Sequence, residues 1–152
     1  MVVTIVKYSA ILSIGFIVGF IFYHKFKTSM GGVLATPFVV LYTLDDPSLF
    51  IVFVFAFLGC IFAIELGKNY FLLYGRRLFY LSISMSLIIS AALFILLNPQ
   101  FSTVFFSITA GIIAYNAHKE LMANVHYLKL VYLWFLEFSI IYILGFIIVN
   151  IY

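Results

Sequence analysis

A short stretch at residues 72–80, LLYGRRLFY, places two guanidinium groups side by side in a chain that is otherwise largely hydrocarbon. Guanidinium groups bind carboxylates and phosphates through paired hydrogen bonds, so this cluster predicts a site for carboxylate or phosphate groups. The alternative is a topology anchor, because basic residues at helix ends extend to the lipid headgroups. The cluster comprises Tyr74, Gly75, Arg76 and Arg77.

Two carboxylates lie inside apolar runs. Glu65 is near the end of one run, and Glu137 is about mid-run in YLWFLEFSII. A carboxylate at that depth is costly and normally faces the interior of a helix bundle. For Glu137 two interpretations stay open, an ion or proton site and a structural hydrogen bond. Glu65 precedes Lys68 by three residues, a spacing that favours an ion pair on one helix face.

Two short apolar segments contain glycine, MGGVLATPFVVLYTL at 30–44 and FSTVFFSITAGIIAYNA at 101–117. Short apolar segments interrupted by glycine or proline indicate broken or re-entrant helices. They predict either tight helix packing or a central lining to which each segment contributes. The candidate lining residues are Gly31, Gly32, Thr36, Pro37, Gly111, Tyr115, Asn116 and His118.

The sequence contains no pattern typical of catalysis or metal binding. Its three histidines, His24, His118 and His126, lack the spacing of a metal site. No Ser–His–Asp, Cys–His or phosphate-loop pattern is present. The single cysteine, Cys60, lies in an apolar run and is expected to be a small core residue. We therefore expect no catalytic residue, metal ligand or cofactor site in this chain.

The composition places these residues in a lipid bilayer. The chain has 152 residues, of which 66% are hydrophobic and 9% are charged, whereas soluble domains carry about 25% charged residues. The net charge of +3 is too small to suggest nucleic-acid binding. Long unbroken apolar runs favour helices over barrel strands. The predicted fold is an all-α, polytopic transmembrane protein forming one domain over residues 1–152.

Four apolar runs have the roughly 20 residues that a membrane-spanning helix needs. The first is expected to be a retained helix, because no A-x-A-like signal-peptide cleavage site follows a short core. The two short segments bring the prediction to four long spans and two short, broken or re-entrant helices. The long runs are residues 2–23, 48–67, 78–98 and 127–151.

The chain divides into two similar halves, 1–77 and 78–152, each with a long span, a short glycine-containing segment and a second long span. Gly32 of the first half falls opposite Gly111 of the second, 79 positions later. One explanation is an internal duplication with two-fold symmetry. The other is that hydropathy alone produces such a similarity in a small polytopic protein.

The basic residues bear on orientation, because they accumulate on the cytoplasmic side. If both short segments cross the membrane, the breaks at 24–29, 67–77 and 118–120 share one side. The breaks at 44–48 and 98–100 then share the other side. If the short segments are re-entrant, the basic breaks divide between the sides. The charges favour six crossings and the shortness of the first segment argues against them, so both alternatives stay open.

Four stretches in order resemble the CapC/PgsC family, the small membrane subunit of poly-γ-glutamate synthase. They are KTSMGGVLATPFVVLY, LDDPSLFIVFV, LLYGRRLFYLSI and ITAGIIAYNAHKE. The third is the most specific, since tyrosine–glycine–arginine–arginine before a span is a hallmark of the family. The resemblance covers essentially the whole chain.

The resemblance implies a multi-pass subunit, in the plasma membrane, of a complex that makes and exports anionic polyglutamate. It also implies a separate amide ligase resembling Mur ligases, which uses ATP and Mg²⁺ or Mn²⁺, and a third subunit at the outer face. This chain would anchor the ligase, and a polymer path is a further role. On this resemblance the cluster of Tyr74, Gly75, Arg76 and Arg77 would receive the anionic polymer or dock an acidic patch of the ligase. Three other classes stay open: a small transporter or channel built from a duplicated unit, a membrane-embedded enzyme, and an anchor only.

Overall fold

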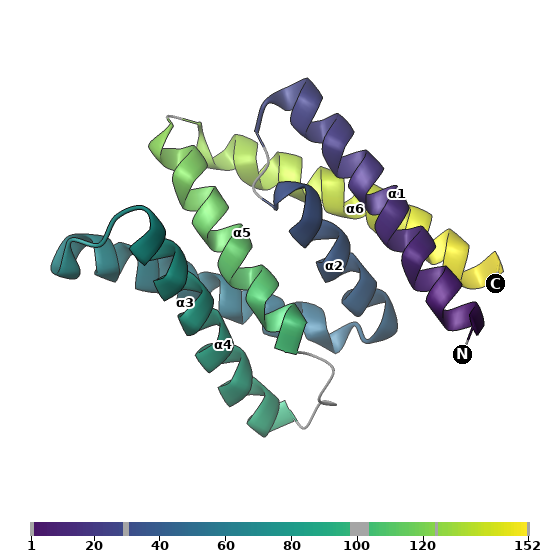
Figure 1. Cartoon of the computed structure of the whole chain (residues 1–152), viewed down its shortest axis with the longest axis horizontal. Coiled ribbons are helices and arrows are strands. Elements are labelled where there is room, and N and C mark those ends of the chain that lie inside the picture. The colour runs from purple at the N-terminus through teal and green to yellow at the C-terminus, as the bar shows by residue number, and fades with distance from the viewer. Residues whose placement is uncertain (1, 29–30, 98–103, 124, 152) are drawn as a thin grey trace.

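The computed structural model describes residues 2–28, 31–97, 104–123 and 125–151, and every regular element within them is an α-helix (Figure 1). This confirms the all-α prediction. The break predicted at 98–100 lies outside the described residues, as do residues 30 and 101–103 of the two short segments. The helices are α1 (Val2–Phe26), α2 (Gly32–Asp45), α3 (Ser48–Phe71), α4 (Arg76–Leu97), α5 (Val104–Met122) and α6 (Tyr127–Ile151).

Within the described residues, four helices are long and apolar enough to cross a membrane, which confirms the four long spans. Their apolar portions have 20 to 24 residues, or about 30–36 Å at 1.5 Å per residue. These lengths match the roughly 30 Å hydrocarbon core of a bilayer. The portions are Val6–Phe26, Ser48–Phe71, Arg76–Ile95 and Tyr127–Asn150.

The short segment in the first half forms a half-length helix that starts deep beside α1. Helix α2 has 14 residues, or about 21 Å. A Cβ on Gly19 would lie 3.3 Å from Cα of Val33, so the start of α2 is level with Gly19. Gly19 precedes the last residue of α1, Phe26, by seven positions, or about 10 Å. Helix α2 therefore begins about two helical turns below the end of α1.

The corresponding segment in the second half, α5, is one helix of 19 residues and does not break at its glycine, as a broken helix would. Gly111 stays helical because α4 supports it on one side. The Ser82 hydroxyl donates to the Gly111 carbonyl at 2.6 Å, and the Gly111 N–H donates to the Ser86 hydroxyl at 3.1 Å. The residues 118–120, expected to form a polar break, continue the helix.

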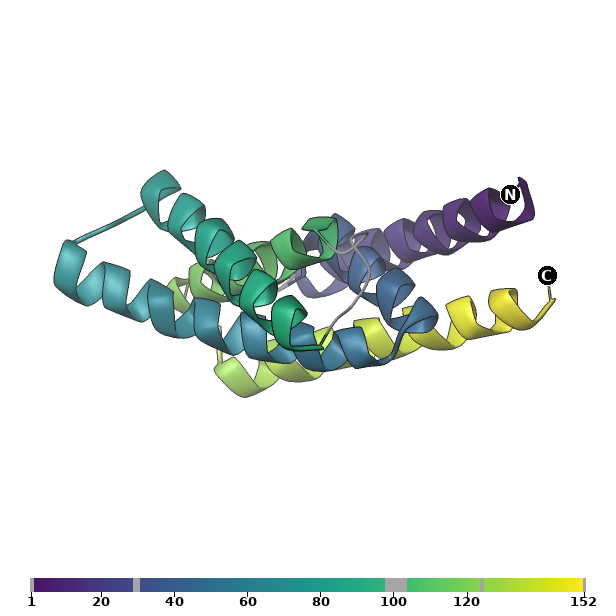
Figure 2. The same cartoon turned by 90° about the horizontal axis from the view of Figure 1, so that it is seen from below.

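Successive helices run in opposite directions, as Figures 1 and 2 both show. The ends of α1, α3 and α5 therefore lie toward one end of the molecule, and the start of α1 and the end of α6 lie toward the other. This is the order of directions expected for six crossings, and α2 does not turn back as a re-entrant hairpin would.

Charge separates along the same axis. Of the eight lysines and arginines, all but Lys7 lie toward the end where α1, α3 and α5 finish, which we call the basic end. Asp45, the last residue of α2, and Asp46, which follows it, lie at the opposite end. The residues at the basic end are Lys25, Lys27, Lys68, Arg76, Arg77, Lys119 and Lys129.

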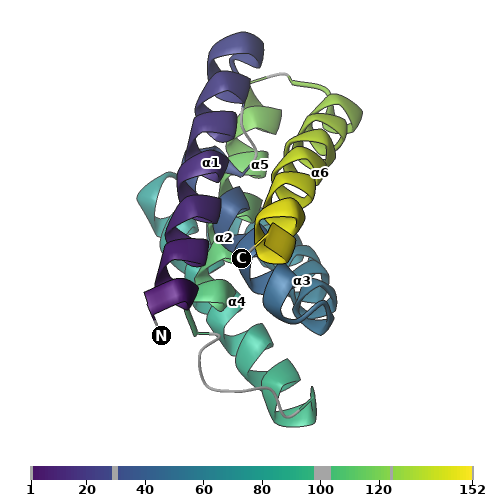
Figure 3. The same cartoon turned by 90° about the vertical axis from the view of Figure 1, so that its right-hand side faces the viewer.

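The packing of the first three helices recurs in the last three. Helix α1 packs on α2 as α4 packs on α5, and α3 packs on α4 and α5 as α6 packs on α1 and α2. Helices α2 and α5 meet between the two sets, as Figure 3 shows from the side. An inverted duplication would produce this pattern, and the division into halves at residue 77 stays a prediction.

Large apolar side chains lie both in the core and on the outer surface. The central core joins α2, α3, α5 and α6 through residues that include Val39, Phe53, Ile113 and Trp134. Outward-facing residues such as Phe62, which is 67% exposed, suit a lipid environment.

Labelling of single cysteines tests whether α2 crosses the membrane. In a background with Cys60→Ala, the variants Lys25→Cys and Asp46→Cys each carry one exposed thiol, at opposite ends of α2. We expect a membrane-impermeant maleimide to label position 46 in intact cells and position 25 only after lysis, because basic residues stay inside. Labelling of both positions from the same side would contradict the crossing.

Candidate functional site

The arginine cluster lies exposed at the basic end, in the turn between α3 and α4. Leu72 ends α3 in a left-handed conformation, with φ of 50°, and Gly75 has φ of 57° just before α4. A Cβ on Gly75 would meet nothing within 4 Å. In the part of the chain that the structure describes, neither Arg76 nor Arg77 forms an ion pair. The cluster is therefore open to an external partner.

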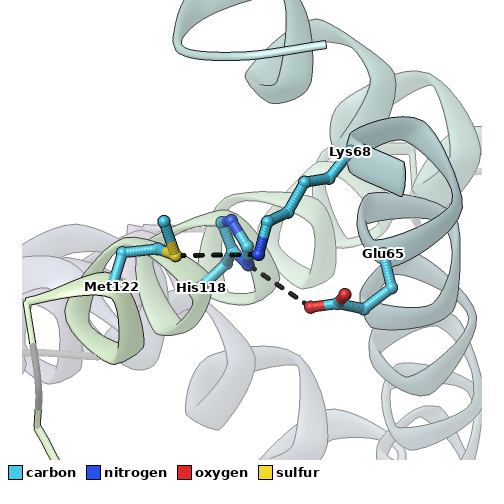
Figure 4. A network of polar contacts seen from close by, with 4 residues as sticks. All are labelled: Glu65, Lys68, His118 and Met122. Atoms are coloured by element: carbon cyan, nitrogen blue, oxygen red, sulfur yellow. Dashed lines mark hydrogen bonds and ion pairs between the residues drawn. The ribbon is translucent and has the colours of Figure 1, made fainter. Parts of the chain in front are cut away.

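A polar network joins α3 to α5 near the same end (Figure 4). Glu65 Oε1 lies 3.9 Å from His118 Nδ1, and Lys68 Nζ lies 3.8 Å from the Met122 sulfur. The spacing favoured a Glu65–Lys68 pair within one helix, but both side chains instead reach across to α5. The Glu65 side chain is 51% exposed, so this contact contributes little to stability.

Two of the predicted lining residues serve helix packing instead. A Cβ on Gly111 would lie 2.8 Å from the Ser82 carbonyl oxygen and 2.9 Å from Cα of Ile83, so α4 and α5 touch through their backbones. The ring of Tyr115 packs edge-on against Phe79, with 5.1 Å between centroids. Both residues face α4, whereas His118 contributes to the network with Glu65.

Two cavities of different character adjoin where α2 and α5 meet. The first has a volume of about 360 Å³ and a mainly apolar lining that includes Gly31, Leu34, Phe38 and Ile112. The second, of about 300 Å³, is more polar and lies at the basic end between Tyr23, Lys119 and Glu120. Gly32, Val33 and Asn116 line both cavities. Gly31, Gly32 and Asn116, three of the predicted lining residues, thus lie on cavity walls between α2 and α5, and their functional role stays a prediction.

A buried polar cluster lies on the other face of the start of α2. Thr36, Trp134 and Glu137 are 0%, 5% and 2% exposed. A Cβ on Gly31 would meet Oγ1 of Thr36 and would lie 3.1 Å from Nε1 of Trp134, so both groups point at Gly31. The Thr36 hydroxyl also faces the Glu137 carboxyl.

These polar atoms make no hydrogen bond of normal geometry with the described residues. Thr36 Oγ1, Trp134 Nε1 and Glu137 Oε1 are buried, and none makes a hydrogen bond of normal geometry there. An unpaired buried polar group costs about 1–3 kcal/mol. Three of them beside one helix start therefore mark a place where a bound species would be stabilised.

Glycine makes the approach of α6 to this helix start possible. A Cβ on Gly19 would lie 3.2 Å from Oε1 of Glu137 and 3.3 Å from both Cα and the carbonyl oxygen of Val33. Pro37, one turn later in α2, has no N–H to donate to that carbonyl. The Val33 carbonyl thus loses its usual helical hydrogen bond close to the glutamate.

Sequence reasoning identified Thr36, Pro37 and Glu137 but not Trp134 or Gly19. The signal for Trp134 was available, because the only tryptophan precedes Glu137 by three residues and so shares its helix face. Gly19 gave no signal, since its role depends on which helix packs against it. Within the described residues, no group of three or more His, Cys, Asp or Glu side chains could hold a metal ion.

Comparison with known proteins relates the chain to a protein family. The model of a protein family described as Capsule biosynthesis CapC matches residues 14–126, well over half of the 152 residues. The matched range contains the arginine cluster, both short segments and both cavities, and it ends before Trp134 and Glu137. No curated protein and no solved structure matches the chain.

Proposed function

Because the chain belongs to the CapC family of capsule biosynthesis, we propose that it is the membrane subunit of a poly-γ-glutamate synthase and export complex. Membership makes it a membrane protein of capsule synthesis. The identity of the polymer and of the partners is the proposal. The partners are an ATP-dependent amide ligase resembling Mur ligases, with Mg²⁺ or Mn²⁺ bound to the ligase, and a subunit at the outer face.

The observation that carries the proposal is the exposed pair Arg76 and Arg77, which has no ion-pair partner among the described residues, at an end that collects seven of the eight lysines and arginines. Poly-γ-glutamate carries about one carboxylate per residue at neutral pH, because a free α-carboxyl ionises far below pH 7. A surface of one charge sign concentrates ligands of the opposite sign. The basic end therefore suits either the growing polymer or an acidic surface of the ligase.

The same charge distribution orients the subunit. Basic residues stay on the cytoplasmic side of the plasma membrane, and ATP is available on that side. The ligase then docks at the basic end, beside Arg76 and Arg77, and the outer-face subunit faces Asp45 and Asp46. Synthesis and export thus begin at the end where the polyanion is electrostatically favoured.

A polymer path needs more than one copy or helices from partners. The cavities of about 360 and 300 Å³ between α2 and α5 adjoin but together reach only part of the way along the helices. A chain of 17.4 kDa leaves little room for a continuous channel. The lining of the first cavity is also mainly apolar, so it does not suit the passage of a polyanion. Anchoring the ligase is therefore the primary role, and the path is shared within the complex.

Co-purification tests the proposal. A tagged copy is expressed with genes for the proposed ligase and outer-face subunit, extracted in mild detergent and analysed by mass spectrometry. We expect the ligase in the eluate, and ATP- and glutamate-dependent polymer formation only when this chain is present. A chain that purifies alone and has no effect on the ligase would overturn the proposal.

That negative result would favour a second candidate, an independent small transporter. The specific observation in its favour is that the packing of helices α1, α2 and α3 recurs in α4, α5 and α6, with the half-length helix α2 at the centre. Transporters built from inverted repeats bind their substrates at such broken helices.

A further inference from the structure

We propose that Glu137, together with Thr36 and Trp134, forms a buried site that reversibly binds a proton beside the start of α2. The proposal concerns side chains that the arginine cluster and the two cavities do not use. It holds whether the polymer is polyglutamate or another polyanion, because it depends on the contacts of Glu137 alone.

Depth and burial are the first reason. Glu137 follows the first residue of α6 by ten positions and precedes the last by 14, which places it about 15 Å and 21 Å from the two ends. The residue is 2% exposed. An ionised carboxylate at mid-membrane is costly unless it is paired.

No described ionic partner balances that charge. The one ion pair among the described residues joins Glu65 to His118. Of the helices around Glu137, α1 contributes Gly19 and α2 contributes Val33 and Thr36, none of them charged. Titratable groups of α1 and α5 line the polar cavity beyond Val33, and α6 has its own basic residue about two turns before Glu137. They are Tyr23, Lys119, Glu120 and Lys129.

Both protonation states nevertheless have groups suited to them. A protonated carboxyl can donate a hydrogen bond. The Val33 carbonyl oxygen is a suitable acceptor, because Pro37 cannot supply its helical donor and because it lies beside Gly19, as Glu137 Oε1 does. An ionised carboxyl only accepts hydrogen bonds, and Thr36 Oγ1 and Trp134 Nε1 are unpaired donors in the described structure. The positive end of the α2 dipole also stabilises the ionised carboxylate. A site with partners for both forms can bind and release a proton.

A metal cation fits the same groups poorly. The indole N–H of Trp134 is only a donor, and the N-terminal end of a helix carries partial positive charge. Both would repel a cation placed between Gly31 and Glu137. The donor set is therefore that of a carboxyl group changing its protonation state.

The geometry also gives the proton a route. Val33 lines both cavities, and its backbone lies against Gly19, which contacts Glu137. The carboxyl is thus separated by a single residue of α2 from the polar cavity at the basic end. Lys119 and Glu120, the titratable groups of that cavity besides Tyr23, can exchange protons with the aqueous side.

Infrared spectroscopy of the full chain in lipid nanodiscs tests the proposal. The chain has three glutamates, so the double variant Glu65→Gln, Glu120→Gln with ¹³C-labelled glutamate leaves Glu137 as the single labelled carboxyl. The variant removes Glu120 from the polar cavity, but Lys119 remains there, and an equilibrium titration depends on the contacts of Glu137 and not on the proton's route. We expect a protonated-carboxyl C=O band at low pH that disappears as the pH rises and returns on acidification. A band absent at every pH, or unchanged across the range, would overturn the proposal.

Two further variants distinguish loss of the proton site from loss of the folded structure. Glu137→Gln should lose the band in an otherwise wild-type chain that keeps its helical circular dichroism. Thr36→Val keeps the side-chain shape but removes one donor to the ionised form, so the pH midpoint of the band should move upward. An unchanged midpoint in Thr36→Val would remove Thr36 from the site.

Discussion

Replacing Arg76 and Arg77 together with glutamine is expected to lower polymer formation by the co-expressed synthase about tenfold or more, while the protein still inserts into the membrane. Both side chains are exposed and unpaired in the described structure, so glutamine removes charge without disturbing packing. Electrostatic attraction of a charged ligand changes association rates by about 10- to 1,000-fold. The measurement is the polymer made per unit of membrane-extracted complex.

Two matched variants separate a specific site from overall charge. Arg76→Lys with Arg77→Lys keeps the charge and loses only the forked hydrogen bonds. Lys25→Gln with Lys27→Gln removes two charges from the same end but from α1 and the residue after it. We expect the lysine variant to be intermediate and the α1 variant to stay near wild type. Unchanged yield in the double glutamine variant would leave the arginines as topology anchors.

Replacing Gly111 with alanine is expected to destabilise the protein by about 1–3 kcal/mol, the usual cost of overpacking a core. The new methyl group would lie 2.8 Å, 2.9 Å and 3.0 Å from backbone atoms of Ser82 and Ile83. Backbone cannot move aside as a side chain can, so α4 and α5 must separate. Their separation would also strain the hydrogen bonds that Ser82 and Ser86 make to Gly111. Thermal unfolding of the purified protein in detergent measures the effect.

Gly59→Ala is the matched control within α3. A Cβ there would meet the terminal methyl of Ile89, the far end of a flexible side chain that can rotate away. Alanine also favours a helix interior over glycine by about 1 kcal/mol. We expect near-wild-type stability for Gly59→Ala. Equal destabilisation by the two substitutions would contradict the close backbone contact between α4 and α5.

The helical fold could be predicted from the sequence because hydropathy is a local property of each segment. Long apolar runs define the spans, and the ranges predicted from hydropathy agree with α1, α3, α4 and α6 to within a few residues. The prediction failed where tertiary contact decides the local structure. Gly111 suggests a break, yet α4 packs on that side and supplies two serine hydroxyls.

The candidate site was only partly predictable for the same reason. Glu137 and Thr36 stand out as polar groups in apolar runs, and the Gly31–Gly32 pair marks the start of a half-length helix. That these residues from α2 and α6 meet is a property of the packing, in which Gly19 of α1 allows the approach. No periodicity in the sequence carries that information.

Reconstitution into sealed proteoliposomes tests the central claim, that this chain is the membrane subunit through which a polyanion synthase makes and exports its product. The ligase, the outer-face subunit and this chain are inserted together, and ATP, Mg²⁺ and radiolabelled glutamate are supplied outside. In vesicles whose basic end faces outward, we predict labelled polymer inside, protected from an added polyglutamate hydrolase, and none when this chain is omitted. Equal polymer formation without this chain, or polymer that stays wholly outside, would contradict the claim.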